Sequence, residues 1–370
     1  MTTDSVNLNS AYERLESIRT AVSARVLASF EETVAAHEVI GPEIQPLIAV
    51  ARSLLPGGKR LRAGFTAAGW CAFGGQFDAE EVVAAGAGVE LFQAAALVHD
   101  DIIDDSHTRR GIEAAHLQLA RLHQHHHLTG DGPRFGRAGA ILLGDLLLVA
   151  AVREFDRALD GLGGNARGSA SRIVTEMMAG VTLGQYLDIY AQSAQEVEDP
   201  AVVLDRAERV LRAKSARYSV EQPLCLGAAM AGGEAEDIRR CAAIGVPIGE
   251  AFQLRDDLLG VFGDPDVTGK PAADDLREGK RTVLVAIALE RAVPEDATRL
   301  RAALGDAALS GQQVHALRSI ITGTGAPAVV ESMIRTRTDV GLGALEDAQL
   351  APEAVAMVRT LAAAAVARSS

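Results

Sequence analysis

One stretch, ELFQAAALVHDDIIDDSHTRRG at residues 90–111, limits what the rest of the chain can be. Its apolar pattern predicts a helix whose end carries Asp100, Asp101, Asp104 and Asp105. Residues four apart share a helix face, so these aspartates form two pairs. Paired carboxylates at the end of an apolar helix repel each other and resist desolvation unless a cation lies between them. A solvated acidic helix end is the simpler alternative for this stretch alone.

A second stretch has the same character. The segment FQLRDDLLGVFGD, residues 252–264, places Asp256 and Asp257 in another apolar helix. Two aspartate-rich helices of this kind favour two sets of metal ligands that face one cavity. Carboxylate oxygens point to Mg²⁺, which prefers oxygen ligands and commonly bridges to phosphates.

Small aliphatic side chains dominate the chain and predict an all-α protein. Of its 370 residues, 48% are hydrophobic but only 4% are aromatic. Ala-rich segments with few alternating β-branched runs favour closely packed helices. The chain shows no repeat of fixed period and no break in composition that would mark a linker. We therefore expect one domain over residues 1–370, with the polar residues 1–10 frayed.

Charge and cysteine content exclude several classes of protein. A net charge of −13 argues against nucleic acid as a partner, because binding it would need a basic face. Cys71, Cys225 and Cys241 are widely spaced and odd in number. They suggest neither a disulfide framework nor a zinc site, and they fit a reducing cytoplasm. The N-terminal residues do not have the pattern of a signal peptide.

The most apolar stretch, residues 138–152, carries Asp145 at its middle and is too short to cross a bilayer. We expect no transmembrane segment, a cytoplasmic location, and a hydrogen-bonded core position for Asp145. Four histidines lie between residues 123 and 127, next to Gly and Pro residues. Histidine clusters can bind transition metals, but this context favours an exposed loop.

Positive charges gather at a few places in this acidic chain. The turn GGKRLR, residues 57–62, carries three of them, and others lie at residues 109–110 and 270–281. Arg and Lys pair well with phosphate oxygens, although an exposed basic turn would look the same. The long Gly- and Pro-containing loop at residues 263–281, with its lysines, suits a lid over a charged substrate.

These features together indicate a class of reaction. Mg²⁺ held by the aspartates would bind a diphosphate, and Arg109, Lys214 and Lys270 would contact its remaining oxygens. The helix at residues 82–98 offers an apolar lining for a hydrocarbon chain. Metal-assisted departure of a diphosphate from an apolar tail is the chemistry that this combination supports.

A further group of cations is more than one diphosphate needs. Lys59, Arg62 and Arg110 therefore predict a second anionic substrate. From GGKRLR to GKRT, residues 57–282, the motifs follow the order seen in trans-isoprenyl diphosphate synthases, and the chain resembles this polyprenyl synthetase family. The resemblance implies an isoprenoid synthase-type all-α bundle around a central cavity, a homodimer, and a cofactor set of about three Mg²⁺ ions. It also implies two substrates, isopentenyl diphosphate and an allylic diphosphate.

The resemblance assigns roles to single residues. The metal ligands that it implies are Asp100, Asp101, Asp104, Asp256 and Asp257. Among these, Asp100 and Asp104 are implied to bind Mg²⁺ directly. The implied substrate-binding residues are Lys59, Arg60, Arg62, Gln93, Arg109, Arg110, Lys270 and Lys280. Gln185 and Asp188 match a family element that lies near the reacting carbons, while Lys214 with Ser215 and Phe252 with Gln253 match two further family pairs. The catalytic residues that the resemblance implies are Gln185, Lys214, Ser215 and Gln253.

Two positions depart from the family pattern. Ser215 stands where the family has Thr, which keeps the hydroxyl group. Gly260 stands where many members have the third aspartate of the second motif. Asp256 is still expected to hold a metal ion, so we expect activity.

The implied mechanism is a head-to-tail condensation. The departing diphosphate leaves an allylic cation, the isopentenyl double bond attacks it, and a proton is lost to the released diphosphate. Ala95 and Ala96 occupy the positions where fifteen-carbon synthases carry aromatic residues, so the hydrocarbon pocket should be open there. Phe92, one turn deeper, is expected to form its floor. The predicted product is geranylgeranyl diphosphate (C20), with a somewhat longer chain as the next choice.

Two alternatives remain. A terpene cyclase also uses aspartate-rich helices, but it needs no second diphosphate site, so GGKRLR and Arg110 argue against it. A non-catalytic subunit that partners an active synthase would be expected to have lost aspartates or basic residues, and both aspartate segments persist here.

Overall fold

Helices make up nearly all the regular structure of this computed structural model, which describes residues 3–194, 199–264 and 273–367. The first half of the chain forms α1 (Thr3–Ala35), the short η1 (Glu38–Ile40) and η2 (Pro42–Ile44), α2 (Gln45–Leu54), α3 (Leu61–Ala72), α4 (Glu80–Ile103), α5 (Ala115–His125), α6 (Gly132–Leu159) and α7 (Gly164–Ser193). The second half forms α8 (Pro200–Val210), the π-helical η3 (Leu211–Glu221), α9 (Gln222–Met230), α10 (Ala235–Phe262), α12 (Asp274–Arg277), α13 (Val283–Arg291), α14 (Pro294–Ala303), α15 (Gly311–Gly323), α16 (Ala326–Asp347) and α17 (Pro352–Val366).

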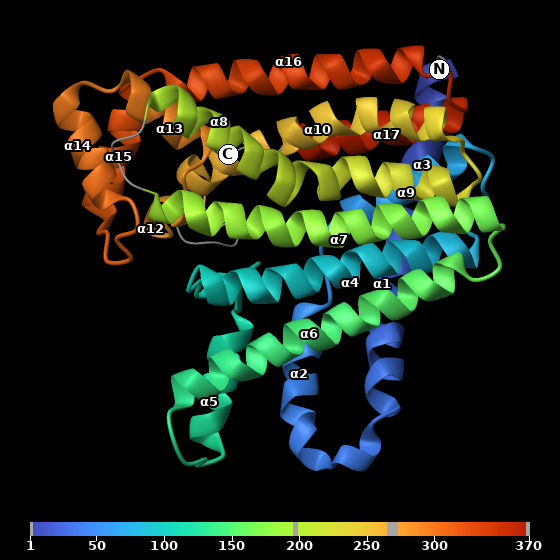
Figure 1. The fold of residues 1–370 in the computed structure, drawn as a ribbon, viewed down its shortest axis with the longest axis horizontal. Helices are drawn as coiled ribbons and strands as arrows, with labels where there is room; N and C mark the ends of the chain where they lie inside the picture. Colours follow the sequence, from blue (N-terminus) through green and yellow to red (C-terminus); the bar gives the residue numbers. More distant parts are fainter. Residues whose placement is uncertain (1–2, 195–198, 265–272, 368–370) are drawn as a thin grey trace.

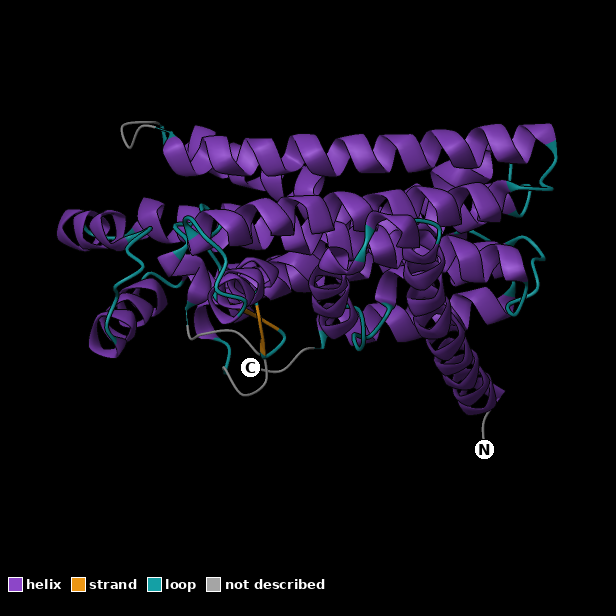
Figure 2. Cartoon of the chain, turned by 90° about the horizontal axis from the view of Figure 1, so that it is seen from below, coloured by secondary structure: helices purple, strands orange, loops and turns teal. Residues whose placement is uncertain are grey.

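The strands of the described residues are β1 (Thr108–Arg109) and β2 (Ile112–Glu113). They pair antiparallel as a small hairpin that follows α4 (Figure 2). The all-α prediction is confirmed, and the hairpin is an addition to it. Its turn places Arg110 and Gly111 at positive φ, so the chain reverses at the second arginine of the RRG sequence.

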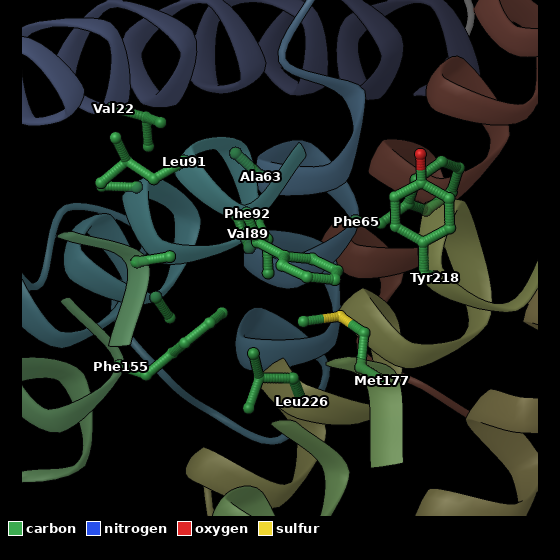
Figure 3. Packing of buried hydrophobic residues seen from close by; sticks show 14 of the residues in the cluster. Val22, Ala63, Phe65, Val89, Leu91, Phe92, Phe155, Met177, Tyr218 and Leu226 are labelled. Atoms are coloured by element: carbon green, nitrogen blue, oxygen red, sulfur yellow. The ribbon is translucent and has the colours of Figure 1, made fainter. Parts of the chain in front are cut away.

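The long helices lie side by side, with α4 near the middle of the bundle (Figure 1). Helix α4 packs against α6 and α3, while α10 packs against η3 and α16. One large apolar cluster includes Val22, Phe65, Leu91 and Leu226 (Figure 3). A smaller cluster joins the second half of α10 to helices α13–α16 and includes Leu258, Leu284 and Ile334. The site described below is a cavity that α4 and α10 both line.

Local sequence sets where these helices begin. The Glu234 side chain accepts a hydrogen bond from the backbone at Asp237, whose own side chain accepts one in return, and this capping box starts α10. Asp131 caps α6 by accepting a hydrogen bond from the backbone N–H of Arg134, with Pro133 in the first turn. Thr282 caps α13 in the same way, which fixes the end of the loop that follows α10.

Helix α1 begins at Thr3, and the fraying expected for residues 1–10 stays a prediction. Ala11 and Ile18 are buried in the core, and the preceding polar residues continue the helix that these contacts anchor.

Two expectations for residues 138–152 differ from the structure, namely the length of the apolar helix and the core position of Asp145. This stretch belongs to α6, a helix of 28 residues, and by length and composition both α4 and α6 could cross a membrane. Helix α4 is a core helix, with 72% of its most apolar window buried in the protein. The same share is 39% for α6, whose outer face is exposed. Asp145 lies on that outer face with its side chain 59% exposed, and Nε2 of His99 lies 3.5 Å from its Oδ1. Sequence periodicity could not show which face of α6 lacks a neighbour.

Candidate active site

A cavity of about 640 Å³ opens between α4, α7, η3 and α10. It brings together most of the residues that the sequence singled out. Those that line it are Lys59, Arg62, Gln93, Ala96, Asp100, Arg109, Arg110, Gln185, Asp188, Lys214, Ser215, Phe252, Gln253, Asp256, Asp257 and Lys280. Residues more than 200 positions apart in the chain thus share one site.

Asp100 lies at the negative end of α4, where a carboxylate is disfavoured by the helix dipole. Lys214 compensates for this, because its Nζ lies 3.1 Å from Asp100 Oδ1 and 2.7 Å from Asp188 Oδ2. Burial alone would raise the pKa of Asp100, but the charges of Lys214, Lys280 and Arg109 outweigh it and hold that pKa well below its usual range. Asp100 is therefore ionised within a cluster of cations.

Asp101 does not line the cavity as a metal ligand should. Arg109 Nε donates a hydrogen bond to Asp101 Oδ1 at 2.9 Å, and Arg109 Nη2 also contacts this carboxylate. The side chain of Asp101 is only 5% exposed. The implied metal role is thus not what its position supports. Asp101 instead orients Arg109, whose Nη2 lies 3.4 Å from Asp100 Oδ2.

Asp104 lies one turn after Asp100, on the same side of the helix, as the spacing predicted. Its Oδ2 is 3.2 Å from Lys280 Nζ, and its side chain is 2% exposed. The pKa of Asp104 is raised to about 6, mainly because the side chain is buried. The charge of Lys280 opposes this rise, and the negative charge of Asp100 adds to it. Ser106 Oγ donates to Glu278 Oε1 at 2.7 Å, which ties the end of α4 to the loop after α10. That loop therefore covers Asp104, which does not line the cavity in this structure. The resemblance had implied that Asp104 binds Mg²⁺ directly.

The second aspartate set lies on α10. Asp256 and Asp257 both line the cavity, and Gln253 Nε2 donates a hydrogen bond to Asp257 Oδ1 at 2.8 Å. Burial and the neighbouring carboxylate of Asp275 raise the pKa of Asp257 to about 8, and Asp256 adds to this effect. In the metal-free protein the Asp257 carboxyl therefore keeps its proton up to about pH 8.

The π-helical segment η3 presents Lys214 and Ser215 to the cavity. It lies very close to α7, because a Cβ atom on Gly184 would come within 2.5 Å of the Lys214 backbone nitrogen. Only glycine at position 184 allows this approach. The close contact places Gln185, the next residue along α7, beside Lys214 and Ser215 in the cavity wall.

A second cationic group lies at the mouth of the cavity and comprises Lys59, Arg62 and Arg110. Arg62 Nη2 donates to Ser219 Oγ at 2.7 Å, and its guanidinium lies over the Tyr218 ring, 4.4 Å from the centroid. The Tyr218 hydroxyl donates in turn to Gln93 Oε1. Tyr218 thus links the two predicted residues Arg62 and Gln93.

Arg60 is the exception in the GGKRLR segment. It has a left-handed backbone conformation (φ 50°) at the start of α3, and it is 5% exposed. Its Nη1 lies 3.4 Å from Glu90 Oε2, and its Nη2 donates to the Leu55 carbonyl at 2.7 Å. The left-handed turn directs Arg60 into the core, so Arg60 does not line the cavity, and its substrate-binding role stays a prediction that this position does not favour. Lys270 lies outside the described residues.

The apolar part of the cavity is lined by Ala96 and Leu97 of α4 and by Val181 of α7. Ala96 therefore leaves the pocket open at its position, as predicted. Ala95 is 2% exposed and lies in the core, so it does not line the cavity. Phe92 is also buried behind the wall, and its ring packs edge-on against Tyr218, with centroids 6.2 Å apart (Figure 3). Tyr218 lines the cavity, and Phe92 packs against it from behind.

The residues present fit Mg²⁺ in a particular way. Within the described residues, no three His, Cys, Asp or Glu side chains converge closely enough to hold a metal ion alone. Asp100 on one wall and Asp256 with Asp257 on the other offer carboxylate oxygens to a shared space. Mg²⁺ usually keeps several waters and is bound by one or two carboxylates together with substrate phosphates. A cation bound at the α10 side would lower the raised pKa of Asp257 and favour its ionised form.

Several lining residues received no role from the sequence, and Tyr218 and Asp275 are examples. Tyr218 shares a helix face with Lys214, and that spacing was the only available sign of it. Asp275 lies in α12, within the acidic part of the predicted lid, and lines the cavity next to the second aspartate set. Nothing in a single sequence shows which acidic residue of such a loop turns inward.

Known proteins share these features. A sequence model of the family described as polyprenyl synthetase matches residues 45–321. A crystal structure of geranylgeranyl pyrophosphate synthase from Corynebacterium glutamicum, complexed with isoprenyl diphosphate and magnesium, is 40% identical, covers 94% of this chain and 99% of its own, and superposes with a TM-score of 0.86. The geranylgeranyl diphosphate synthase of Mycobacterium tuberculosis is 31% identical over 81% of this chain and 78% of its own length. The geranylfarnesyl diphosphate synthase of Aeropyrum pernix is 32% identical over 75% and 80%, respectively. The chain belongs to the polyprenyl synthetase family, the trans-isoprenyl diphosphate synthases.

Proposed function

We propose that this enzyme condenses isopentenyl diphosphate head-to-tail with an allylic diphosphate to give geranylgeranyl diphosphate. The observation that carries this proposal is the pairing, in one cavity, of two carboxylate-bearing walls with two separate cationic groups. One diphosphate needs one such group, so the second accounts for a second diphosphate substrate.

The allylic diphosphate is assigned to the space between α4 and α10. Arg109, Lys214 and Lys280 surround Asp100 there and would pair with phosphate oxygens once these enter. Asp100 and Asp256 would hold Mg²⁺, for which we propose about three ions, as the family resemblance implies. Mg²⁺ would neutralise the charge that develops on the departing diphosphate.

Isopentenyl diphosphate is assigned to the mouth of the cavity. Lys59, Arg62 and Arg110 line this region, and the hydrogen bond from Tyr218 to Gln93 fixes the wall behind Arg62. The double bond of this substrate would then lie near the reacting carbon of the allylic substrate. Gln185, Gln253 and Ser215 line the space between and would bind and orient the two chains.

The cation formed by departure of the diphosphate needs a dry, apolar surrounding. Ala96, Leu97 and Val181 provide it on the hydrocarbon side. The proton lost after condensation is assigned to the released diphosphate. Asp100 and Asp188 are ion-paired with Lys214, so the oxygens of the diphosphate would be the nearest bases.

The C20 product is supported by the relatives and by the pocket. The relatives include geranylgeranyl diphosphate synthases, together with geranylfarnesyl and nonaprenyl synthases. Phe92 behind Tyr218 is the proposed stop for the growing chain. Phe92→Ala would let Tyr218 move back and should lengthen the product by about one isoprene unit. Chromatography of the dephosphorylated products measures this, and an unchanged chain length would remove Phe92 as the stop.

A homodimer is proposed on the exposed faces of α6 and α7, which contact each other. The large apolar side chains exposed on these two helices are Phe135, Ile141, Leu142, Val149, Val152, Leu183, Tyr186, Ile189 and Tyr190. A surface this apolar is characteristic of an interface between subunits. Leu142→Glu should give a monomer in sedimentation experiments, whereas a wild-type chain that sediments as a monomer would contradict the proposal.

A cytoplasmic location is supported by Cys71, Cys225 and Cys241, which are free and buried.

A product assay tests the proposed reaction. Purified protein, Mg²⁺ and labelled isopentenyl diphosphate are combined with dimethylallyl, geranyl or farnesyl diphosphate in turn. The proposal predicts incorporation that stops at C20. Longer discrete products would keep the reaction and change the chain length, and failure to incorporate label with any primer would refute the proposed function.

A further inference from the structure

One segment of the cavity wall is held by very close backbone contacts from two neighbouring helices. This segment is the π-helical η3, whose Lys214 and Ser215 line the cavity. A Cβ atom on Gly249 of α10 would lie 2.3 Å from the Ala216 carbonyl oxygen, and Gly184 of α7 makes a similarly close approach. Glycines let the helices approach this closely, but they offer no side chain that would fix how η3 lies along them.

A buried carboxylate of α10 supplies the directional contact. Glu250 follows Gly249, and its side chain is only 4% exposed. Arg212 Nε, from the first turn of η3, donates a hydrogen bond to Glu250 Oε1 at 2.7 Å. Arg337 Nε, from α16, lies 3.0 Å from Glu250 Oε2. Both carboxylate oxygens are thus paired, and Glu250 joins α10 to η3 on one side and to α16 on the other.

The ion pair with Arg212 fixes the part of η3 that reaches into the cavity. Arg212 lies two residues before Lys214, whose Nζ contacts carboxylates of α4 and α7. Arg217, the other arginine of η3, is instead hydrogen-bonded to Glu221, four residues further along the same segment. A displacement of about 1 Å far from the chemistry can slow a reaction about a hundredfold. A change at Arg212 should therefore reach the reaction through Lys214.

We propose that Glu250 is a positioning residue for the condensation and that it acts through Arg212. The ion pair holds η3 where Lys214 and Ser215 face the departing diphosphate. This inference rests on the proposed function, because it needs a diphosphate beside Lys214. Glu250 itself does not line the cavity, so it acts without touching substrate or metal. The contact should affect the rate of diphosphate departure, and it should not affect binding of isopentenyl diphosphate at the mouth of the cavity.

Single-turnover kinetics at saturating substrate test this, because the rate constant then depends only on molecules that have bound substrate. Arg212→Gln removes the charge from a side chain that is 44% exposed, so the variant should fold. Its single-turnover rate should fall about tenfold, while KM for isopentenyl diphosphate stays within about twofold. The matched control is Arg337→Gln, which removes the other arginine from the same carboxylate and is 38% exposed. It should keep its rate within about twofold of wild type.

A double-mutant cycle shows whether Arg212 and Glu250 act as a pair. Glu250→Gln should slow the same step about tenfold, and the double variant with Arg212→Gln should be no slower than either single variant, because all three lose one contact. Arg212→Lys keeps the charge and should recover most of the rate. Circular dichroism melts show whether Glu250→Gln folds, and the Arg212 variants decide the matter if it does not.

Hydrogen exchange gives a readout that does not depend on turnover. The backbone amides of residues 211–221 should exchange faster in Arg212→Gln than in wild type, because η3 has lost its directional contact with α10. The same amides should be unchanged in Arg337→Gln.

Several results would overturn the inference. Arg212→Gln could react within about twofold of wild type, Arg212→Gln and Arg337→Gln could lose rate equally, or the losses of the double variant could multiply. A lower melting temperature with an unchanged single-turnover rate would show that Glu250 only stabilises the fold. In each case wild type would still incorporate isopentenyl diphosphate. Failure of the wild-type chain to incorporate it would instead refute the proposed function.

Discussion

The two carboxylate walls of the cavity differ in how their charge is balanced. On α4, Asp100 is surrounded by Lys214, Lys280 and Arg109, and its pKa is held low. On α10, burial and neighbouring carboxylates raise the pKa of Asp257 to about 8. The first wall is thus organised by the protein's own cations before any ligand arrives. The second depends on a bound cation, and for this reason we expect it to control metal affinity.

The largest effect should come from the first wall. Asp100→Asn removes the carboxylate with which both Lys214 and Arg109 form ion pairs. We expect kcat to fall by about 10³-fold or more. Asp105→Asn is the matched control, because Asp105 ends the same segment with its side chain 84% exposed, and Asn tolerates its left-handed backbone. Comparable losses in both variants would show that the effect is structural.

A smaller effect on turnover, but a larger one on metal affinity, should follow from the second wall. Asp256→Asn should raise the Mg²⁺ concentration needed for half-maximal activity about 10–100-fold, with partial recovery of the rate at high Mg²⁺. Titration of activity with Mg²⁺ measures this. A loss of rate that Mg²⁺ cannot restore would mean that the two walls act alike.

The pH dependence of the metal-free protein should report the same difference. An unfolded aspartate ionises near pH 3.9, whereas folded Asp257 keeps its proton up to about pH 8. The folded state then holds more protons, so Asp257 makes the free energy of unfolding fall between about pH 4 and about pH 8, and Asp104 acts in the same direction up to about pH 6. Asp100 acts in the opposite sense, because its lowered pKa stabilises the folded state above about pH 4. This stabilisation is lost as the solution is acidified.

Because binding of Mg²⁺ requires the ionised carboxylate, its affinity should rise up to about tenfold per pH unit as Asp257 loses its proton. Calorimetric titrations between about pH 6 and about pH 8.5 measure this slope. In Asp257→Asn both the slope and the pH-dependent loss of stability should flatten. A slope unchanged in this variant would place the titrating group elsewhere.

The smallest effect should come from Asp101, which acts through Arg109. Asp101→Asn should leave the number of bound Mn²⁺ ions unchanged and raise KM for the allylic substrate about three- to tenfold, because Arg109 loses an ionic partner but stays in place. A lower number of bound ions would instead restore Asp101 as a metal ligand.

The sequence was informative wherever local spacing decides an outcome. Helix α4, the common side of Asp100 and Asp104, and the two cationic groups follow from periodicity and charge. Four details depend on tertiary contacts that spacing does not contain. Arg60 turns inward because its own backbone has a left-handed conformation, and Asp101 accepts a hydrogen bond from Arg109. Asp145 is exposed because nothing covers its side of α6 in the described chain, and Asp275 reaches Gly260 only through the packing of α12.

The central claim is that both walls hold a single diphosphate through shared cations. The most direct test is a crystal structure of the protein with Mg²⁺ and an allylic thiolodiphosphate, an analogue that does not release its diphosphate. We expect metal ions that bridge one diphosphate to Asp100 on one side and to Asp256 on the other. A diphosphate bound without metal contacts to α10, or one held only at the mouth by Lys59 and Arg62, would contradict it.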